Sequence, residues 1–170
     1  MTPAVEAAKA AGVAYELLAY EHDPRVAAYG VEAAEALGLP PESVFKTLVA
    51  KVDGRLVVGI VPVAAHLDLK ALAAAAGGRK AEMAPPAEAE RATGYVLGGI
   101  SPLGQKRRLP AVIDESALTL GTVHVSAGGA GWRWRSLPLT SCGWRALRWR
   151  RSRGARACGG AARGRNASAG

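Results

Sequence analysis

Two apolar runs joined by a two-residue turn signal constrain this chain more than any other feature of its sequence. The runs are SVFKTLVAKV, residues 43–52, and RLVVGIVPV, residues 55–63, and Asp53 and Gly54 stand between them. Asp-Gly is among the dipeptides that most favour the tight turn of a β-hairpin, because both turn positions need a positive φ. The sequence therefore predicts an antiparallel hairpin of two core strands.

Helix and strand signals lie on both sides of this hairpin. Thr2 and Pro3 mark the start of a first helix, since threonine caps a helix and proline is tolerated in its first turn, and Gly12 is a plausible stop. We expect further helices near residues 30–37, 67–76 and 86–92, and short strands near residues 14–20, 111–114 and 122–125. Because these elements interleave without a strict βαβ repeat, they predict an α/β fold with a mixed central β-sheet and flanking helices.

Length and composition favour a folded protein. A chain of 170 residues with 49% apolar residues suits one globular domain. No stretch approaches the roughly 20 apolar residues of a membrane span, and the N-terminus lacks a signal-peptide pattern. We therefore expect a cytoplasmic protein with no membrane partner.

The net charge of +8 comes entirely from the last quarter of the chain. Residues 1–129 contain 12 Lys and Arg against 14 Asp and Glu, whereas residues 130–170 contain 10 Arg and no acidic residue. The same segment holds all four tryptophans and both cysteines, Cys142 and Cys158. We therefore predict a domain over residues 1–129 and an aberrant Arg/Trp/Gly-rich tail over residues 130–170.

Three interpretations of the tail compete: a basic arm for RNA or a membrane, a disordered linker, and translation in a shifted reading frame. With GC-rich codons and a shift of two bases, GWRWRSLPLTSCGWRAL becomes LEVALAPADLVRLAGA, which has an alternating strand and a Pro-Ala-Asp helix start. The tail itself has no sustained helical or strand period. We favour the frameshift, and we expect the tail to be disordered and its cysteines to form no metal site or disulfide.

The 1–129 segment offers no obvious protein nucleophile. It contains no cysteine, and its serines lie in no G-x-S-x-G motif. His22, His66 and His124 lack metal-ligand spacing, which favours structural or surface roles. We expect neither a metal nor any other cofactor.

Lys46 interrupts the apolar strand VFKTLV. Lysine is almost never buried without a partner or a purpose. Either this is an edge strand whose lysine reaches water, or a partly desolvated ammonium faces a pocket, where it can bind an anion or stabilise an oxyanion. Thr47 points to the opposite face of a regular strand, so the two residues can serve one site only near a strand end or a bulge.

The segment GGISPLGQKRRLP, residues 98–110, which we call the glycine loop, combines backbone freedom with positive charge. Its glycines are Gly98, Gly99 and Gly104, and its basic residues are Lys106, Arg107 and Arg108. The glycines either form a plain surface turn or bring N–H groups close to a carbonyl oxygen or a phosphate. The basic run is either a solvated face or a contact for nucleic-acid phosphates.

Nine stretches in this order closely resemble the YbaK/EbsC family. They are MTPAV, YEHDP, VFKTL, IVPVA, LDLK, EMA, ATGYVLGGISPLGQKRRLP, VID and VHVSAG. Members of that family are bacterial aminoacyl-tRNA deacylases that clear mischarged Cys-tRNA(Pro), and they are related to the editing domain of prolyl-tRNA synthetases. The resemblance covers residues 1 to about 128, and the glycine loop together with KTL is its specific part.

The resemblance implies a mixed α/β fold and a set of site residues. Lys46 falls on the strand lysine that the family needs for activity. The residues implied to contact substrate are Tyr20, Tyr29, Thr47, Gly98, Gly99, Ser101 and Ser126. Family members continue with a strand and a helix like those of the shifted string, so we expect the chain to lack both, together with an acidic residue near the pocket.

We therefore expect a trans-editing deacylase, a hydrolase or lyase that removes cysteine from Cys-tRNA(Pro). Lys46 and the glycine loop would stabilise the oxyanion, and water or the substrate's own thiol would attack. The implied partners are the 3′ end of aminoacyl-tRNA and prolyl-tRNA synthetase. The alternatives are a non-catalytic module that binds tRNA or a synthetase, and an inactive truncated product.

Overall fold

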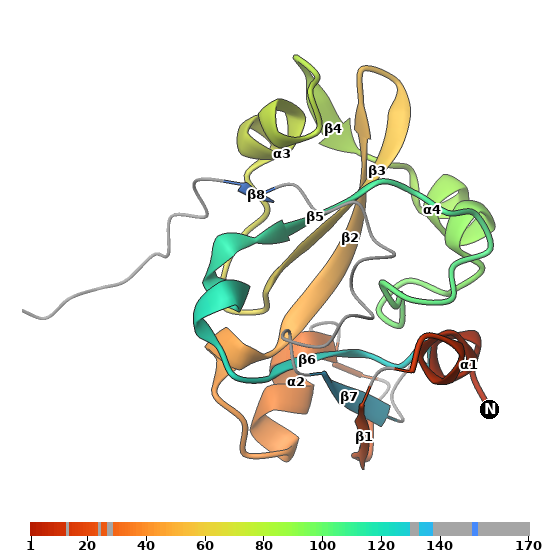
Figure 1. Ribbon diagram of the computed structural model, residues 1–170, viewed down its shortest axis with the longest axis vertical. Helices are drawn as coiled ribbons and strands as arrows, with labels where there is room; N and C mark the ends of the chain where they lie inside the picture. The colour runs from red at the N-terminus through yellow and green to blue at the C-terminus, as the bar shows by residue number, and fades with distance from the viewer. Residues whose placement is uncertain (13, 24, 27–28, 130–132, 138–150, 153–170) are drawn as a thin grey trace, which may run out of the picture.

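The predicted hairpin forms the centre of the molecule (Figure 1). The computed structural model describes residues 1–12, 14–23, 25–26, 29–129, 133–137 and 151–152. Strands β2 (Phe45–Val52) and β3 (Arg55–Pro62) pair antiparallel along their whole length. Asp53 and Gly54 both have positive φ, 48° and 80°, as a type I′ turn requires. The hairpin prediction is confirmed.

The hairpin belongs to a five-stranded sheet with the order β4-β2-β3-β5-β8. The added strands are β4 (Ala81–Met83), β5 (Ala111–Asp114) and β8 (Arg151–Ser152). The β3–β5 and β5–β8 pairs are parallel, and the β2–β3 and β2–β4 pairs are antiparallel. This mixed sheet confirms the predicted fold class.

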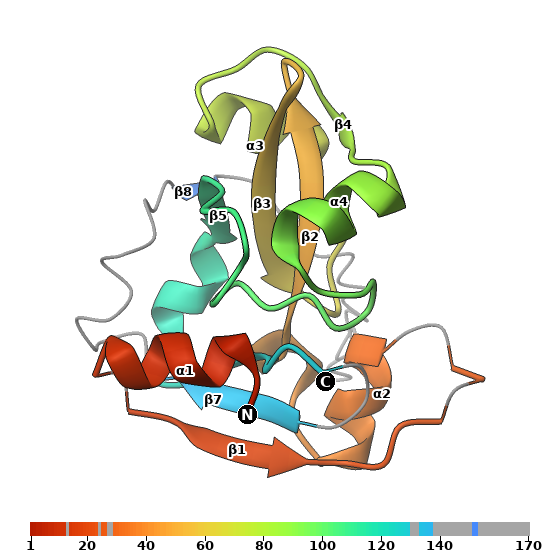
Figure 2. The ribbon, with the colours of Figure 1, turned by 90° about the vertical axis from the view of Figure 1, so that its right-hand side faces the viewer.

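A second sheet of three antiparallel strands lies across the foot of the hairpin (Figure 2). Its order is β1 (Glu16–Ala19), β7 (Arg133–Leu137) and β6 (Val123–Ser126). An isolated parallel bridge between Val44 and His124 joins β6 to the residue that precedes β2. The end of β6 is therefore held close to the start of β2.

Four α-helices and two 3₁₀ helices complete the described part of the chain. Their bounds are α1 Pro3–Ala10, α2 Tyr29–Ala36, α3 Leu69–Ala75, α4 Pro86–Thr93, η1 Pro41–Ser43 and η2 Glu115–Thr119. Thr2 caps α1 as predicted, and α3 begins two residues later than predicted because the Asp68 side chain accepts the Ala71 N–H and ends the preceding loop. None of the described helices is long and apolar enough to cross a membrane.

Two short pieces of the predicted tail are described, and both are strands. β7 is the middle strand of the three-stranded sheet, and β8 adds an edge to the larger sheet. Residues 130–132, 138–150 and 153–170, which include both cysteines, lie outside the described residues. The domain boundary after residue 129 stays a prediction.

The main hydrophobic core fixes the glycine loop to the hairpin. Phe45 and Ile60 of the hairpin are fully buried, and they share one cluster with Tyr95, Ile100 and Leu109, which lie on either side of the loop's glycines. Burying a large apolar side chain contributes about 1.5–3 kcal/mol. The loop therefore has a fixed place beside β2.

Candidate functional site

The outer edge of β2 is covered by another strand along only part of its length. β4 pairs with Ala50–Val52, and the Ala84 N–H donates to the Val49 carbonyl at 3.0 Å. In the described part of the chain β4 does not pair with residues 45–48, and we call this stretch the bare edge; β6 meets only its beginning, through the Val44–His124 bridge. In an antiparallel pair, alternate residues direct both backbone polar groups at the same partner. The Val44 carbonyl accepts from the N–H of Val63, the residue after β3, so Val44 and Lys46 direct their backbone polar groups at β3. The N–H and C=O of the next residue, Thr47, therefore face away from β3.

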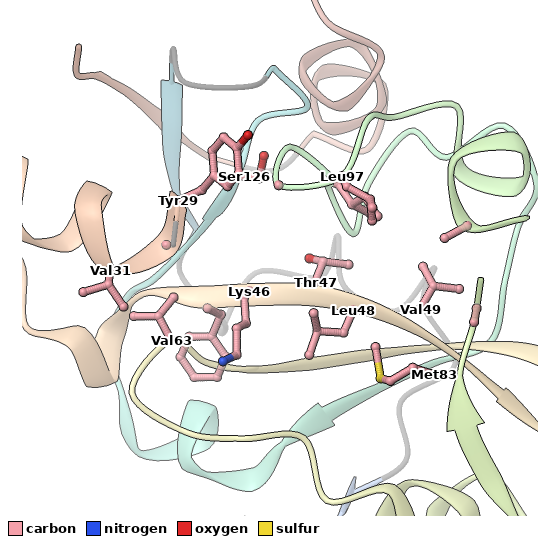
Figure 3. A pocket seen from close by; sticks show the side chains of 16 residues that line it. Tyr29, Val31, Lys46, Thr47, Leu48, Val49, Val63, Met83, Leu97 and Ser126 are labelled. Carbon is pink, nitrogen blue, oxygen red and sulfur yellow. The ribbon is translucent and has the colours of Figure 1, made fainter. Parts of the chain in front are cut away.

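A cavity of about 410 Å³ lies along the bare edge (Figure 3). Its walls come from β2, the first residues of α2, the glycine loop, the β4–α4 segment and the end of β6. Five of the predicted site residues line it: Tyr29, Lys46, Thr47, Gly98 and Ser126. The volume lies within the range typical of pockets for small molecules, about 300–1,000 Å³.

Lys46 and Thr47 reach this cavity from opposite sides of β2. In Figure 3 the Thr47 side chain points toward Ser126 and Leu97, whereas the Lys46 amine lies on the other side of the strand. Both nevertheless line the cavity, because it extends around the bare edge. A regular strand with an uncovered edge thus places neighbouring residues at one site without a bulge.

The two lysines of β2 have different surroundings. Lys51 Nζ lies 2.8 Å from Glu88 Oε2. Lys46 is half-buried and has no carboxylate partner among the residues that the structure describes, and burial lowers the pKa of its amine. Both alternatives considered for Lys46 therefore apply in part, since its strand is an edge at this point and that edge faces a pocket.

The Thr47 hydroxyl is the polar group of the cavity that most needs a ligand. The residue is 8% exposed, and Oγ1 is buried without a hydrogen-bond partner in the described part of the chain. Leaving a buried hydroxyl unsatisfied costs about 1–3 kcal/mol. Because Oγ1 has almost no accessible surface, a ligand would supply the missing partner and recover this cost only after a small movement of the cavity wall.

Gly98 is the loop glycine that reaches the cavity, and only glycine fits there. Its φ is +85°, and a Cβ at this position would lie 2.5 Å from Cδ2 and Cε2 of the Tyr29 ring. The absence of a side chain therefore lets the loop backbone and Tyr29 approach each other closely at the wall of the cavity.

Gly99, Ser101 and Ser126 hold the loop in shape. The Gly99 N–H closes a turn with the Val96 carbonyl, and the Gly99 carbonyl accepts from Ser126 Oγ at 3.0 Å. Ser101 is fully buried, and its Oγ accepts the Leu103 N–H. Of the three predicted loop residues, the structure places Gly98 at the cavity, whereas Gly99 and Ser101 lie behind it.

The remaining predicted residues do not line the cavity. Tyr20 packs beside α2, against the cluster formed by Ala33, Ala34, Val44 and Val63. Lys106, Arg107 and Arg108 are exposed, and the N–H groups of Lys106 and Arg107 donate to carbonyls at the end of α4. Contact of their side chains with nucleic-acid phosphates stays a prediction.

Three exposed apolar residues at the cavity were not anticipated. Val31, Met83 and Leu97 line it and are 39%, 48% and 46% exposed. Leu97 and Met83 both lie within quoted stretches of the resemblance, but no strand period indicates the place of Met83, because β4 is too short to show one. Among the described lining residues there is no cysteine, histidine, aspartate or glutamate.

The family model described as aminoacyl-tRNA editing domain matches residues 23–132. This range contains every predicted site residue except Tyr20. The Enterococcus faecalis protein named "Putative Cys-tRNA(Pro)/Cys-tRNA(Cys) deacylase EbsC" is 42% identical over 100 residues, which are 58% of this chain and 60% of that protein. A proline–tRNA ligase from Acidithiobacillus ferrooxidans is 32% identical over 106 residues, 62% of this chain and 19% of the ligase.

A similar solved structure is described as "Crystal structure of a putative trans-editing enzyme for prolyl tRNA synthetase". It has a TM-score of 0.67 and 26% sequence identity, and the match covers 79% of this chain and 87% of that one. The matched segments span less than two thirds of the length of the two curated relatives. Because the family model matches more than half of the residues, the chain belongs to the aminoacyl-tRNA editing domain family.

Proposed function

We propose that this protein is an aminoacyl-tRNA deacylase that cleaves the ester between a wrongly attached amino acid and the 3′-terminal ribose of a tRNA. Cys-tRNA(Pro) is the proposed substrate, on the strength of the name of the Enterococcus faecalis relative. The observation that carries the proposal is the cavity along the bare edge, where Lys46, Thr47 and Gly98 meet within the range matched by the family model.

The described cavity favours a reaction without a protein nucleophile. Its hydroxyls belong to Tyr29, Thr47 and Ser126, and none of the described lining residues is a histidine or a carboxylate that could act as their base. The Ser126 hydroxyl also donates to the Gly99 carbonyl. The attacking atom then comes from water or from the substrate's own thiol. In the thiol reaction a C–S bond forms, the ester C–O bond breaks, and the thiol proton passes to the ribose oxygen.

Either attack places negative charge on the ester carbonyl oxygen. We assign the backbone N–H groups of Thr47 and Gly98 to this oxygen, because one faces out from the bare edge and the other belongs to the facing wall. A well-placed donor of this kind contributes roughly 3 kcal/mol to the transition state. The unpaired Lys46 ammonium adds its field from the other side of the edge, and the field is strengthened by the low dielectric of a half-buried site.

The surroundings of the cavity suit a nucleic-acid end. Val31, Met83 and Leu97 offer exposed apolar surface for the terminal ribose and base. The exposed basic run at residues 106–108 would contact phosphates, which position a nucleic acid without reading its sequence. Prolyl-tRNA synthetase is the proposed source of the mischarged substrate and a proposed partner.

The test compares the two lysines of β2 in the full chain. Cleavage of Cys-tRNA(Pro) is measured in single-turnover experiments for the parent, Lys46→Met, Lys46→Arg and Lys51→Met. Removing the Lys46 charge should reduce the rate at least about 100-fold, whereas Lys46→Arg, which keeps the charge, should retain more activity and Lys51→Met should change the rate less than twofold.

Two results would overturn the proposal. One is a parent protein that binds Cys-tRNA(Pro) without accelerating its deacylation, which would establish the non-catalytic module instead. The other is equal activity in the parent and Lys46→Met, which would remove the ammonium from the mechanism.

A further inference from the structure

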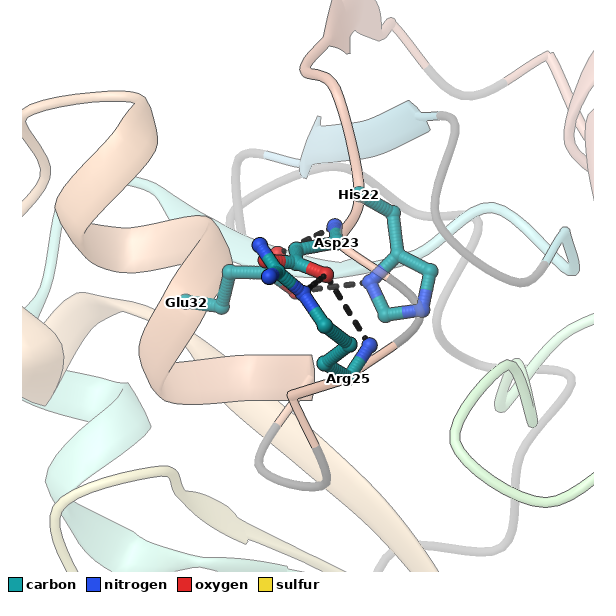
Figure 4. A network of polar contacts seen from close by, with 4 residues as sticks. All are labelled: His22, Asp23, Arg25 and Glu32. Carbon is teal, nitrogen blue, oxygen red and sulfur yellow. Dashed lines mark hydrogen bonds and ion pairs between the residues drawn. The ribbon is translucent and has the colours of Figure 1, made fainter.

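A polar network outside the proposed catalytic groups connects the segment before α2 to the first turn of that helix (Figure 4). His22 Nδ1 lies 2.7 Å from Glu32 Oε2, and both side chains are 13% exposed. The Asp23 N–H donates to Glu32 Oε1 at 2.7 Å. This backbone donor, and secondly the His22 ring, lower the pKa of Glu32. Glu32 is therefore a charged anchor with both oxygens engaged.

His22 also contacts a wall of the cavity. Its ring stacks on the Tyr29 ring with centroids 4.6 Å apart and an interplanar angle of 25°. Tyr29 and Glu32 are three residues apart at the start of α2, a spacing that places them on one face of the helix. His22 thus bridges two side chains of a single helical turn, and Glu32 fixes the imidazole over the tyrosine.

Tyr29 is restrained at a second place by the glycine loop. Its Cδ2 and Cε2 atoms lie where a side chain on Gly98 would have to go. Tyr29 and Ser126 both line the cavity, and Figure 3 draws them at the end toward which Thr47 points. A movement of the Tyr29 ring would therefore change the space at that end.

We propose that His22, held by Glu32, is a positioning residue that fixes Tyr29 in the cavity wall and so limits the size of the aminoacyl group that the site accepts. The size limit rests on the proposed deacylase function, whereas the restraint on Tyr29 does not. His22 is not among the described residues that line the cavity, so it acts through Tyr29 and not on the ester.

The test separates the ring of His22 from its hydrogen bond. His22→Asn keeps a donor for Glu32 and removes the aromatic ring, whereas His22→Phe keeps a stacking ring and removes the donor. His66→Ala, at an exposed histidine, is the control. Each protein is assayed for kcat/KM on Cys-tRNA(Pro) and on homocysteinyl-tRNA(Pro), whose aminoacyl group keeps the thiol and is one methylene larger.

Loss of the stack should reduce discrimination between the two substrates about two- to tenfold in His22→Asn, the range expected for one aromatic pair. His22→Phe should restore part of it, and His66→Ala should leave it unchanged. In a Tyr29→Ala background, His22→Asn should have no further effect on the ratio. Two results would overturn the proposal. One is a discrimination ratio that His22→Asn lowers equally in the parent and in the Tyr29→Ala background, and the other is a ratio that His22→Asn does not change.

A second measurement does not depend on deacylation. The flip rate of the Tyr29 ring, measured by NMR on signals assigned by comparison with Tyr29→Phe, should rise in His22→Asn and stay unchanged in His66→Ala. An unchanged flip rate in His22→Asn would overturn the positioning role even if the protein is a deacylase. A protein that cleaves neither substrate would overturn the proposed function and its size limit, whereas a faster ring flip would still support the restraint on Tyr29.

Discussion

The two halves of β2 have similar sequences and opposite surroundings. In the second half, Ala50–Val52 pairs with β4, and Lys51 forms an ion pair with Glu88. In the first half β4 does not pair with residues 45–48, and Lys46 and Thr47 face a cavity. Exposed strand edges and unpaired buried hydroxyls are normally eliminated in proteins. Their retention in one half of a strand whose other half pairs with β4 is what the proposed binding of a ligand at the first half would explain.

The largest loss of activity is expected when the cavity wall opposite the bare edge is displaced. Gly98→Ala forces a Cβ into the Tyr29 ring at a positive φ, whereas Gly77→Ala imposes the same kind of backbone strain with nothing within 4 Å. We expect Gly98→Ala to lower kcat/KM about 100-fold, as a displacement near 1 Å can do. Both variants should lose about 1–2 kcal/mol of stability from strain alone.

Deacylation kinetics and thermal melting of the two variants check this expectation. Gly77→Ala should melt earlier and keep its activity. Comparable activity in Gly98→Ala and Gly77→Ala would show that the loop is not a wall of the working site.

Thr47→Val is expected to have a smaller effect, which raises the stability of the protein and lowers its activity. Valine has nearly the same shape, and it removes a buried hydroxyl without a partner, so the ligand-free protein should gain about 1 kcal/mol of stability. Deacylation should fall about tenfold if the substrate satisfies that hydroxyl. Melting curves and kcat/KM measure both changes.

Thr93→Val is the matched control, because the Thr93 hydroxyl is also buried but donates to the Ala89 carbonyl at 2.8 Å. This variant should lose about 1 kcal/mol and not gain it. If Thr47→Val were destabilising to the same extent, the hydroxyl would have a structural partner and the bare edge would not be waiting for a ligand.

Local signals explain which parts of this contrast the sequence could predict. Asp53-Gly54 specifies the hairpin turn by itself, Thr2 specifies a helix start, and a lysine within an apolar strand is visible as an exception. The bare edge is different, because it depends on where β4 stops. β4 is three residues long and mostly exposed, so no periodic pattern indicates it.

One clue to the end of β4 was present in the sequence. Pro85 and Pro86 follow Met83 and Ala84, and proline has no N–H to continue a ladder along β2. The roles within the glycine loop could not be separated in this way. That Gly99 and Ser101 support the loop while Gly98 faces the cavity depends on which N–H closes the turn, a detail of backbone geometry.

The pH dependence of the reaction sharpens the contrast between the two lysines. Burial lowers the pKa of Lys46 below its ordinary value of 10.5, and the ammonium is the form that stabilises negative charge. The Lys46 contribution should therefore be complete well below the lowered pKa and be lost as the pH rises through it. The titration of the substrate thiol affects the parent and Lys46→Arg alike, so it cancels when the kcat/KM of the parent is divided by that of Lys46→Arg. This ratio should fall toward alkaline pH. A ratio that does not change with pH would contradict a desolvated ammonium in the mechanism.

The smallest effect is expected in the covered half of the strand. The Lys51 and Glu88 side chains are 25% and 28% exposed, and a pair of this kind contributes about 0–1 kcal/mol because water already solvates both charges. A double-mutant cycle of Lys51→Met and Glu88→Gln, followed by chemical denaturation, should therefore give a coupling energy of no more than about 1 kcal/mol, with deacylation unchanged. Because Lys46 and Lys51 are the same residue type on the same strand, a large loss of activity in Lys51→Met would mean that the strand as a whole, and not its uncovered edge, carries the chemistry.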